Sequence, residues 1–230
     1  RAVPFSVGDL VLLCQPPKES RPSSYPKMES AATGPYRIDR TEVSIEDFES
    51  FENNGGYQNA SLWSTAGQEW LKSTPGGAGR EIRRSNRPPN HPVVAVSYYE
   101  AEAYCTWRGG SLPSAAQWTQ AICSQGPYPW GSDAQKPAAW YSGGKYGQIQ
   151  SVQTQEADVQ GPGLSGPHGV LHGAGNVWEW TQETMGISGE WRALRGGSYA
   201  NLPSYCRCDR SEPALPREQR LTAGFRCVYP

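Results

Sequence analysis

The chain has 230 residues and a formal net charge of −1. This balance argues against nucleic acid or an anionic membrane surface as an obligatory partner. No apolar run approaches the roughly 20 residues that span a bilayer, which argues against direct membrane insertion. With no initiator Met before Arg1, the chain reads as a mature or trimmed product.

The composition favours an irregular fold. Hydrophobic residues make up only 37% of the chain, yet it contains 9 Trp and 12 Tyr, together with 26 Gly and 20 Pro. Such a composition is typical of short strands, a few helices and long ordered loops. We expect aromatic rings to supply much of the buried apolar area.

The cysteines indicate an oxidising location. There are six of them, Cys14, Cys105, Cys123, Cys206, Cys208 and Cys227. No CxxC pair is present, and the Cys-Arg-Cys triplet is too tight to supply two ligands to one structural zinc. Cystines are therefore favoured over metal ligation, and the domain is expected to be extracytoplasmic: periplasmic, at the cell surface or secreted.

The first quarter of the chain predicts a strand, a loop, a second strand and a helix. Val7–Leu13 has the composition of a strand, and the Pro/Ser-rich stretch 15–35 that follows indicates a loop. Tyr36–Val43 predicts the second strand. Ser44 then caps a short helix that Asn53–Gly56 ends.

The middle of the chain predicts two further helices. Residues 57–92 carry aromatic residues without clear periodicity and are expected to form a long loop packed by its own rings. Ser97 and Glu100 have the spacing of a capping box at the start of one helix. Ser114 and Gln117 have the same spacing at the start of the next.

The last part of the chain predicts mainly strands. Residues 124–175 are rich in glycine and indicate another loop. Asn176–Thr181 and Trp191–Gly197 are expected to be strands, and residues 224–228 are expected to form an edge or closing strand.

Seven short stretches carry a family resemblance, in the same order and over most of the chain. They are YRIDRTEVS (36–44), HPVVAVSYYEAEAYCTW (91–107), LPSAAQW (112–118), YPWG (128–131), GNVWEW (175–180), LRGGSY (194–199) and GFRC (224–227). Together they resemble the formylglycine-generating enzyme or sulfatase-modifying-factor family. That family's fold is a variant of the C-type lectin fold.

The resemblance implies an α+β domain over residues 36–230, irregular, low in regular secondary structure and stapled by disulfides. Residues 1–35 depart from the family's usual opening, and we expect them to form an N-terminal extension packed on the domain. Trp178 and Trp180 alternate about Glu179, so on a strand both rings share one face and the carboxylate takes the other.

The resemblance also implies that the family's copper chemistry is missing. Enzymes of the family use two thiolates after the Gly-Gly-Ser-Tyr turn to bind copper and oxidise a substrate cysteine. Here Asn201 stands at the first position and Cys206 at the second. An amide cannot replace a thiolate as a ligand of Cu(I). We therefore expect neither bound copper nor formylglycine synthesis.

By the same resemblance, the cysteines pair as Cys105–Cys227 and Cys123–Cys208. Cys14 and Cys206 are left over. They form either a third disulfide or two free thiols, and in the second case Cys206 is a candidate reactive residue if the protein is an enzyme.

A calcium ion is the one cofactor that the resemblance suggests. In the family, the carboxylate of Glu179 and the backbone carbonyls of Gly175 and Val177 would hold it. His172 occupies a position where the family has Asn or Asp, and imidazole is a poor calcium ligand. Glu179 therefore either binds calcium or accepts buried hydrogen bonds. His168 and His172 are four residues apart but surrounded by glycine, which favours a loop pair without function.

The segment 199–212 is the candidate binding surface. In this fold it lies where a substrate or ligand is met, and its residues are of the types that binding surfaces favour. The candidate ligand-binding residues are Tyr199, Asn201, Ser204, Tyr205, Arg207, Asp209, Arg210 and Glu212. The segment also resembles the variable region of lectin-fold proteins that retroelements diversify, although an ordinary solvated loop is an equally open interpretation.

Three functions remain open on the sequence alone. The first is a binding domain that displays segment 199–212 to a protein, a peptide or a small ligand. The second is an oxidase-like enzyme of the same family that matures a peptide or a secreted metabolite. The third is a structural module of a surface assembly.

Overall fold

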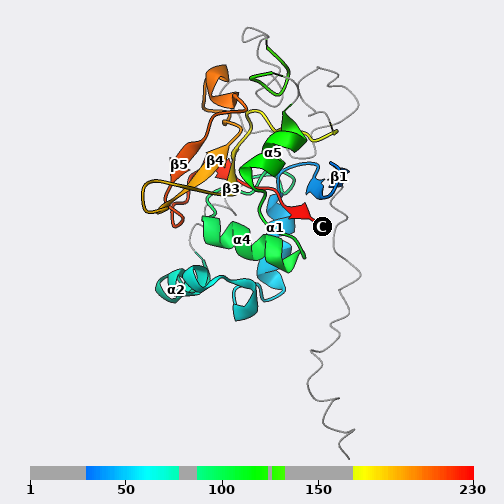
Figure 1. Ribbon diagram of the computed structural model, residues 1–230. Helices are drawn as coiled ribbons and strands as arrows, with labels where there is room; N and C mark the ends of the chain where they lie inside the picture. Colours follow the sequence, from blue (N-terminus) through cyan, green and yellow to red (C-terminus); the bar gives the residue numbers. More distant parts are fainter. Residues whose placement is uncertain (1–29, 78–86, 124–125, 133–167) are drawn as a thin grey trace, which may run out of the picture.

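The computed structural model describes residues 30–77, 87–123, 126–132 and 168–230, which Figure 1 shows as a coloured ribbon. Within these ranges, four α-helices and two small sheets surround an aromatic core. Among these residues no helix is both long enough and apolar enough to pass through a bilayer. This mixture of short elements confirms the α+β, irregular fold class.

Strands β1 and β2 come first along the chain, the α-helices follow, and strands β3 to β7 come last. The α-helices are α1 (Ile45–Asn53), α2 (Thr65–Ser73), α4 (Tyr98–Trp107) and α5 (Ala115–Ile122), and the 3-10 turns are η2 (Ala60–Leu62) and η3 (Pro203–Cys206). The strands are β1 (Ser30–Ala32), β2 (Arg37–Asp39), β3 (Trp178–Met185), β4 (Trp191–Arg195), β5 (Glu212–Ala214), β6 (Ala223–Gly224) and β7 (Val228–Tyr229).

The three predicted helices begin at their predicted caps. In α4 the backbone N–H of Glu100 donates to Ser97 Oγ at 3.2 Å, and the backbone N–H of Ser97 donates to Glu100 Oε2 at 2.8 Å. Ser114 and Gln117 form the same reciprocal box at α5, and Ser44 caps α1. Each cap satisfies backbone donors that the first helical turn leaves unpaired.

Helix α2 is absent from the prediction, which placed a continuous loop over residues 57–92. Its cap, Ser64, accepts from the backbone N–H of Gly67, so glycine stands where a capping box would have Glu or Gln. A Cβ at position 67 would lie 3.3 Å from Ser64 Oγ and 3.4 Å from the Trp63 ring, so this glycine sits close against the cap and the ring. Trp70 of α2 stacks on Trp63, with ring centroids 6.1 Å apart.

The strands form two sheets. One has the order β1-β2-β7, and the other has the order β5-β4-β3-β6. Residues 30–32 of the predicted loop 15–35 are strand β1, paired antiparallel to β2. The predicted strand 224–228 is in fact two, because β6 pairs with β3 while β7 pairs with β2. The chain therefore crosses from one sheet to the other through residues 225–227.

Aromatic rings fill the core, as the composition predicts. Phe48, Tyr104 and Phe225 are buried and in mutual contact, with the Tyr104 and Phe225 ring centroids 5.3 Å apart. Trp178 and Trp180 belong to the same core cluster. Both therefore lie on one side of β3, which is the alternation that the sequence predicts.

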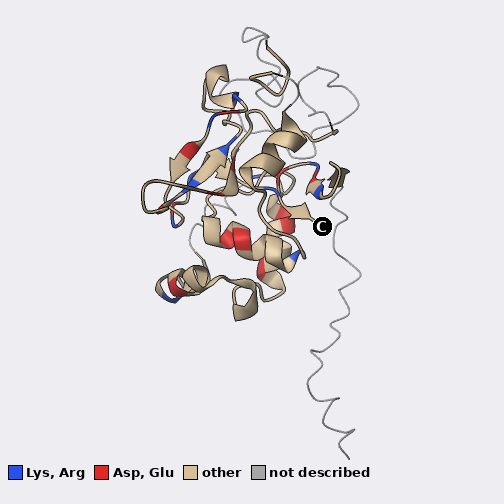
Figure 2. Ribbon diagram, in the orientation of Figure 1, with Lys and Arg blue, Asp and Glu red and all other residues tan. Residues whose placement is uncertain are grey.

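Charged side chains are distributed unevenly over these elements (Figure 2). Helices α1 and α4 carry acidic residues and no basic ones, while β4 carries Arg192 and Arg195. The same sheet also carries acidic residues, Glu183 on β3 and Glu212 on β5, so it is mixed in charge.

Two disulfides join the helices to the C-terminal part of the chain. Cys105 of α4 is bonded to Cys227, and Cys123 at the end of α5 is bonded to Cys208. Both pairs are those that the resemblance implies. Within the described residues Cys206 is a buried free thiol, and Cys14, its partner in the predicted third disulfide, lies outside them.

Removal of the Cys105–Cys227 bond should lower stability strongly. The two cysteines are 122 residues apart, and closing a loop of this size in the unfolded chain contributes about 5 kcal/mol. We expect the double variant Cys105→Ala, Cys227→Ala to lose most of this from its free energy of unfolding in urea without reductant. In dithiothreitol the free energies of unfolding of the variant and the unchanged protein should converge. Without reductant, a loss below about 1 kcal/mol would contradict the assigned disulfide.

Candidate functional site

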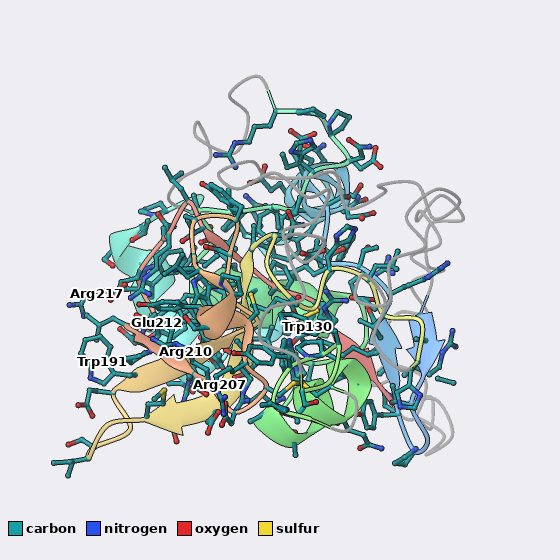
Figure 3. The ribbon with its side chains drawn as sticks, turned by 90° about the horizontal axis from the view of Figure 1, so that it is seen from above. Trp130, Trp191, Arg207, Arg210, Glu212 and Arg217 are labelled. Carbon is teal, nitrogen blue, oxygen red and sulfur yellow. A yellow bond between two sulfur atoms is a disulfide. The ribbon has the colours of Figure 1, made fainter. Side chains whose placement is uncertain are left out.

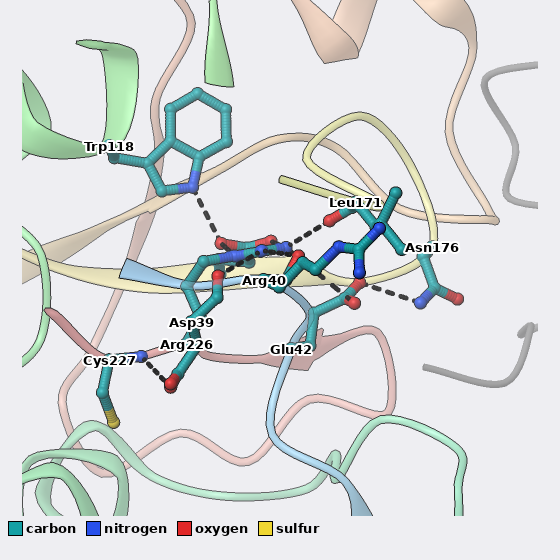
Figure 4. Close-up of polar contacts among 9 residues, drawn as sticks. Asp39, Arg40, Glu42, Trp118, Leu171, Asn176, Arg226 and Cys227 are labelled. Carbon is teal, nitrogen blue, oxygen red and sulfur yellow. Dashed lines mark hydrogen bonds and ion pairs between the residues drawn. The ribbon is translucent and has the colours of Figure 1, made fainter. Parts of the chain in front are cut away.

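Glu179 is held by an arginine. It is fully buried in β3 and accepts from Arg226, whose Nε lies 2.8 Å from Oε2 and whose Nη2 lies 2.7 Å from Oε1 (Figure 4). Trp118 Nε1 donates to Oε2 at 2.8 Å. Of the two interpretations left open, the geometry fits a carboxylate that accepts buried hydrogen bonds.

The described residues do not fit the calcium site that the resemblance implies. An ion beside Gly175 and Val177 would compete with Arg226 for Glu179, because a buried cation already pairs with this carboxylate. No group of three or more His, Cys, Asp or Glu side chains able to hold a metal occurs within the described ranges. His168 is exposed whereas His172 is buried, so this pair does not face a common site.

Arg226 also binds the backbone of two other segments. Its Nη1 donates to the carbonyls of Asp39 (3.1 Å) and Arg40 (3.0 Å), and its Nη2 donates to the carbonyl of Leu171 (2.9 Å). Glu42 lies 3.9 Å from the same guanidinium. One buried side chain thus connects the end of β2, the 171 loop and β3.

Two groups beside Arg226 have strongly shifted pKa values. Burial raises the pKa of Glu42 to about 8, although Arg226 opposes the shift and Asn176 donates to Glu42 Oε1 at 2.8 Å. Burial, with a smaller contribution from Arg226, lowers the pKa of His172 to about 3. Neither ring nitrogen of His172 has a hydrogen-bond partner among the described residues. The imidazole is therefore neutral at physiological pH.

Asn201 faces the protein rather than a metal. Its Oδ1 accepts from the hydroxyl of Ser198 at 2.6 Å and from the backbone N–H of Ser198 at 3.1 Å. The side chain therefore closes the turn that follows the glycine pair. Its amide oxygen already has two donors.

Cys206 is sealed beneath the same turn. It is fully buried and packs in a cluster with Tyr128, Trp130 and Ala174. Gly197 has φ +76°, and a Cβ there would lie 2.8 Å from Cys206 Sγ. Burial raises the pKa of the Cys206 thiol to about 12. The nucleophilic thiolate is thus strongly disfavoured, which argues against Cys206 as a reactive residue.

Of the candidate ligand-binding residues, Ser204 and Asp209 are exposed and the others are half-buried, and arginine and tyrosine lie together among them. The guanidinium of Arg210 lies 3.8 Å from the centroid of the Tyr205 ring, and that of Arg207 lies 5.8 Å from the Tyr128 ring. Arg207 also forms a two-point ion pair with Asp209 (2.8 and 2.6 Å). We call Tyr128, Tyr205, Arg207, Asp209 and Arg210 the arginine–tyrosine strip.

The strip continues past residues that the sequence analysis did not select. Figure 3 shows Arg207, Arg210 and Glu212 in a row that begins near Trp130 and ends near Trp191 and Arg217. Tyr128 and Trp130 stack with ring centroids 4.7 Å apart. The YPWG motif contained both rings, but nothing in the sequence indicates that they lie beside residues 205–210.

The remaining predicted residues contribute unequally to this surface. Ser204 is exposed, and Tyr199 is half-buried. Glu212 belongs to β5, where its Oε1 lies 4.0 Å from Arg220. Asn201 is half-buried, and its Oδ1 is bonded to Ser198.

The backbone under the strip is fixed from three directions. Cys208 is bonded to Cys123, its N–H donates to the carbonyl of Pro127 at 2.8 Å, and its carbonyl accepts from Arg195 Nη1 at 2.9 Å. Exposed side chains on a fixed backbone lose less conformational entropy when a ligand binds.

The shifted pKa of Glu42 should appear in the pH dependence of stability. The folded chain keeps this proton up to about pH 8, whereas the unfolded chain releases it near 4.5. Because the native state binds more protons, the free energy of unfolding should fall as pH rises, by on the order of 1 kcal/mol between about pH 7 and 8.5. Glu42→Gln should flatten this slope in urea melts. The exposed Glu46→Gln should not, and an unchanged slope in Glu42→Gln would contradict the assignment.

The Cys206 thiol should be almost inert in the folded protein. We expect iodoacetamide to label Cys206 at least 100-fold more slowly in native protein than in 8 M urea, since the thiol is both buried and protonated. Mass spectrometry of the peptide that contains Cys206 measures the two rates. Comparable rates would show that the thiol is accessible.

Comparison with known proteins agrees with this architecture. Residues 8–230 match the family described as Sulfatase-modifying factor enzyme 1-like domain. The chain is 29% identical to the formylglycine-generating enzyme of Mus musculus, covering 99% of this chain and 74% of that enzyme. It is 28% identical to the hercynine oxygenase of Mycobacterium tuberculosis over 84% of this chain, and it spans about half, 52%, of that protein.

A solved structure shows the same fold at lower identity. Treponema denticola variable protein 1 superposes with a TM-score of 0.57 at 20% identity, covering 84% of each chain. The match over residues 8–230 includes every helix and strand described above. The chain therefore belongs to the family of sulfatase-modifying factor enzyme 1-like domains.

Proposed function

We propose that this protein is an extracytoplasmic binding domain that uses the arginine–tyrosine strip to hold a protein, peptide or small ligand and does not generate formylglycine. The observation that carries the proposal is the pair Asn201 and Cys206. The Oδ1 of Asn201 closes the turn at Ser198, and the thiol of Cys206 is buried. The partly exposed side chains beside them are of types that binding surfaces favour.

The state of Asn201 and Cys206 argues against copper chemistry. A linear Cu(I) site needs two sulfur ligands, and a single thiol with a neighbouring amide does not supply them. Asn201 is bonded to Ser198, and burial raises the pKa of Cys206 to about 12, so deprotonation for a metal would be costly. The family relationship therefore supports a shared scaffold more strongly than it supports shared formylglycine synthesis.

The strip has the physical properties of a binding surface. Arg210 stacks on Tyr205, and no ion pair to a carboxylate restrains it among the described residues. Tyrosine buries a large area at little entropic cost, and both arginine and tyrosine are enriched where binding energy concentrates. The two disulfides support an extracytoplasmic location, because cystines persist in oxidising compartments.

Binding through the strip can be tested with a phage-displayed peptide library. We expect peptides enriched on the unchanged domain to bind Arg210→Ala at least 10-fold more weakly, about 1.4 kcal/mol, because the stacked guanidinium is removed. Arg37→Ala is the matched control, an exposed arginine on the other sheet. Enriched peptides that bind Arg210→Ala as tightly as the unchanged domain would contradict a site at the strip.

The catalytic alternative has its own assay. With Cu(I), oxygen and a cysteine-containing peptide, we expect no aldehyde above a protein-free blank, because only one of the two thiolates is present. Mass spectrometry of the peptide measures the product. Aldehyde formation that disappears in Cys206→Ala would overturn the proposal and favour an oxidase.

A further inference from the structure

A separate cavity lies between the η2–α2 segment, helix α4 and strand β3. Its volume is about 530 Å³, which is within the range of small-molecule sites. Leu62, Trp63 and Leu112 give it an apolar wall. None of its lining residues belongs to the arginine–tyrosine strip.

One carboxylate dominates the polar side of this cavity. Glu102 Oε2 accepts from the Ser64 hydroxyl at 2.5 Å, and its Oε1 accepts from the Tyr98 hydroxyl at 3.3 Å. A carboxylate offers about four acceptor positions, so Glu102 can accept further donors. Among the described residues no lysine or arginine lines the cavity, and Arg192, 4.7 Å from the Tyr98 ring centroid, is not a lining residue.

In three other polar side chains of the cavity, a hydroxyl or amide donor already has a hydrogen-bond partner. Ser61 donates its hydroxyl to Asn59 Oδ1 at 2.7 Å, and Thr106 donates to a backbone carbonyl of α4 at 3.0 Å. Gln182 Nε2 donates to the carbonyl of Leu112 at 2.7 Å. These groups therefore offer mainly lone pairs, and Ser111 adds an exposed hydroxyl.

From this balance we propose that the cavity binds an organic cation that carries N–H donors: a primary ammonium or a guanidinium with an alkyl stem. The cationic head donates to Glu102 and the lone pairs around it, and the stem lies along the wall formed by Leu62 and Trp63. An anionic ligand would be repelled by Glu102, because the nearby Arg192 lies over the Tyr98 ring and is not part of the cavity lining. A neutral polyol could donate to the same lone pairs, but it would leave the negative charge of Glu102 uncompensated.

The same cation has two sources, a free amine or a basic side chain of a partner. Titration calorimetry with two probes distinguishes them: butylammonium chloride for the free amine, and N-acetyl-lysine methylamide for a side chain. Their neutral analogues, butanol and N-acetyl-norleucine methylamide, test the charge. We expect one or both cationic probes to bind at least 10-fold more tightly than the analogues. The tighter probe identifies the source.

Two variants locate the binding. Glu102→Gln should weaken the cationic probes at least 10-fold, and Gln182→Lys, which places an ammonium at an exposed position of the wall, should weaken them similarly. Glu69→Gln is the control: it removes the same charge from α2, where Glu69 pairs with Lys72 in solvent. Arg210→Ala should leave these affinities unchanged, which keeps this site separate from the strip.

The result that overturns the proposal is also clear. Either no cationic probe binds below about 10 mM, or the neutral analogues bind equally well. Unchanged affinity in both Glu102→Gln and Gln182→Lys, each shown to be folded by its thermal melt, would have the same meaning.

Discussion

The structure depends on the buried guanidinium of Arg226. All five of its N–H donors are used: two by Glu179 and three by the carbonyls of Asp39, Arg40 and Leu171. Such a cation is tolerable in an apolar interior only when every donor is satisfied and a carboxylate compensates the charge. The same residue lies where the chain crosses between the two sheets, next to the cystine at Cys227. One polar cluster therefore fixes how the sheets meet.

Local signals in the sequence were sufficient for part of this fold. Ser44, Ser97 and Ser114 identify the starts of three helices because capping is a short-range interaction. Helix α2 escaped detection because Gly67 replaces the usual acidic or amide partner of its cap. The division of the last strand could not be predicted either, since β6 and β7 differ only in their distant partners.

The candidate site was likewise only partly predictable from the sequence. Segment 199–212 was identified because its residues are consecutive, and the family resemblance marked the replaced thiolate. The partner of Glu179 is 47 positions away, and Tyr128 reaches Arg207 only through the fold. The family resemblance singled out the carboxylate of Glu179, but only the tertiary structure shows that it binds an arginine.

The fixed backbone beneath the arginine–tyrosine strip has an evolutionary consequence. The links at Cys208 are a disulfide to Cys123, a main-chain hydrogen bond to Pro127 and a hydrogen bond from the buried side chain of Arg195, and none requires a particular outward side chain. Positions such as Ser204, Asp209 and Arg210 can therefore mutate with little penalty to folding. Selection could thus refit the domain to new targets by exchanging a handful of codons while its framework stayed constant.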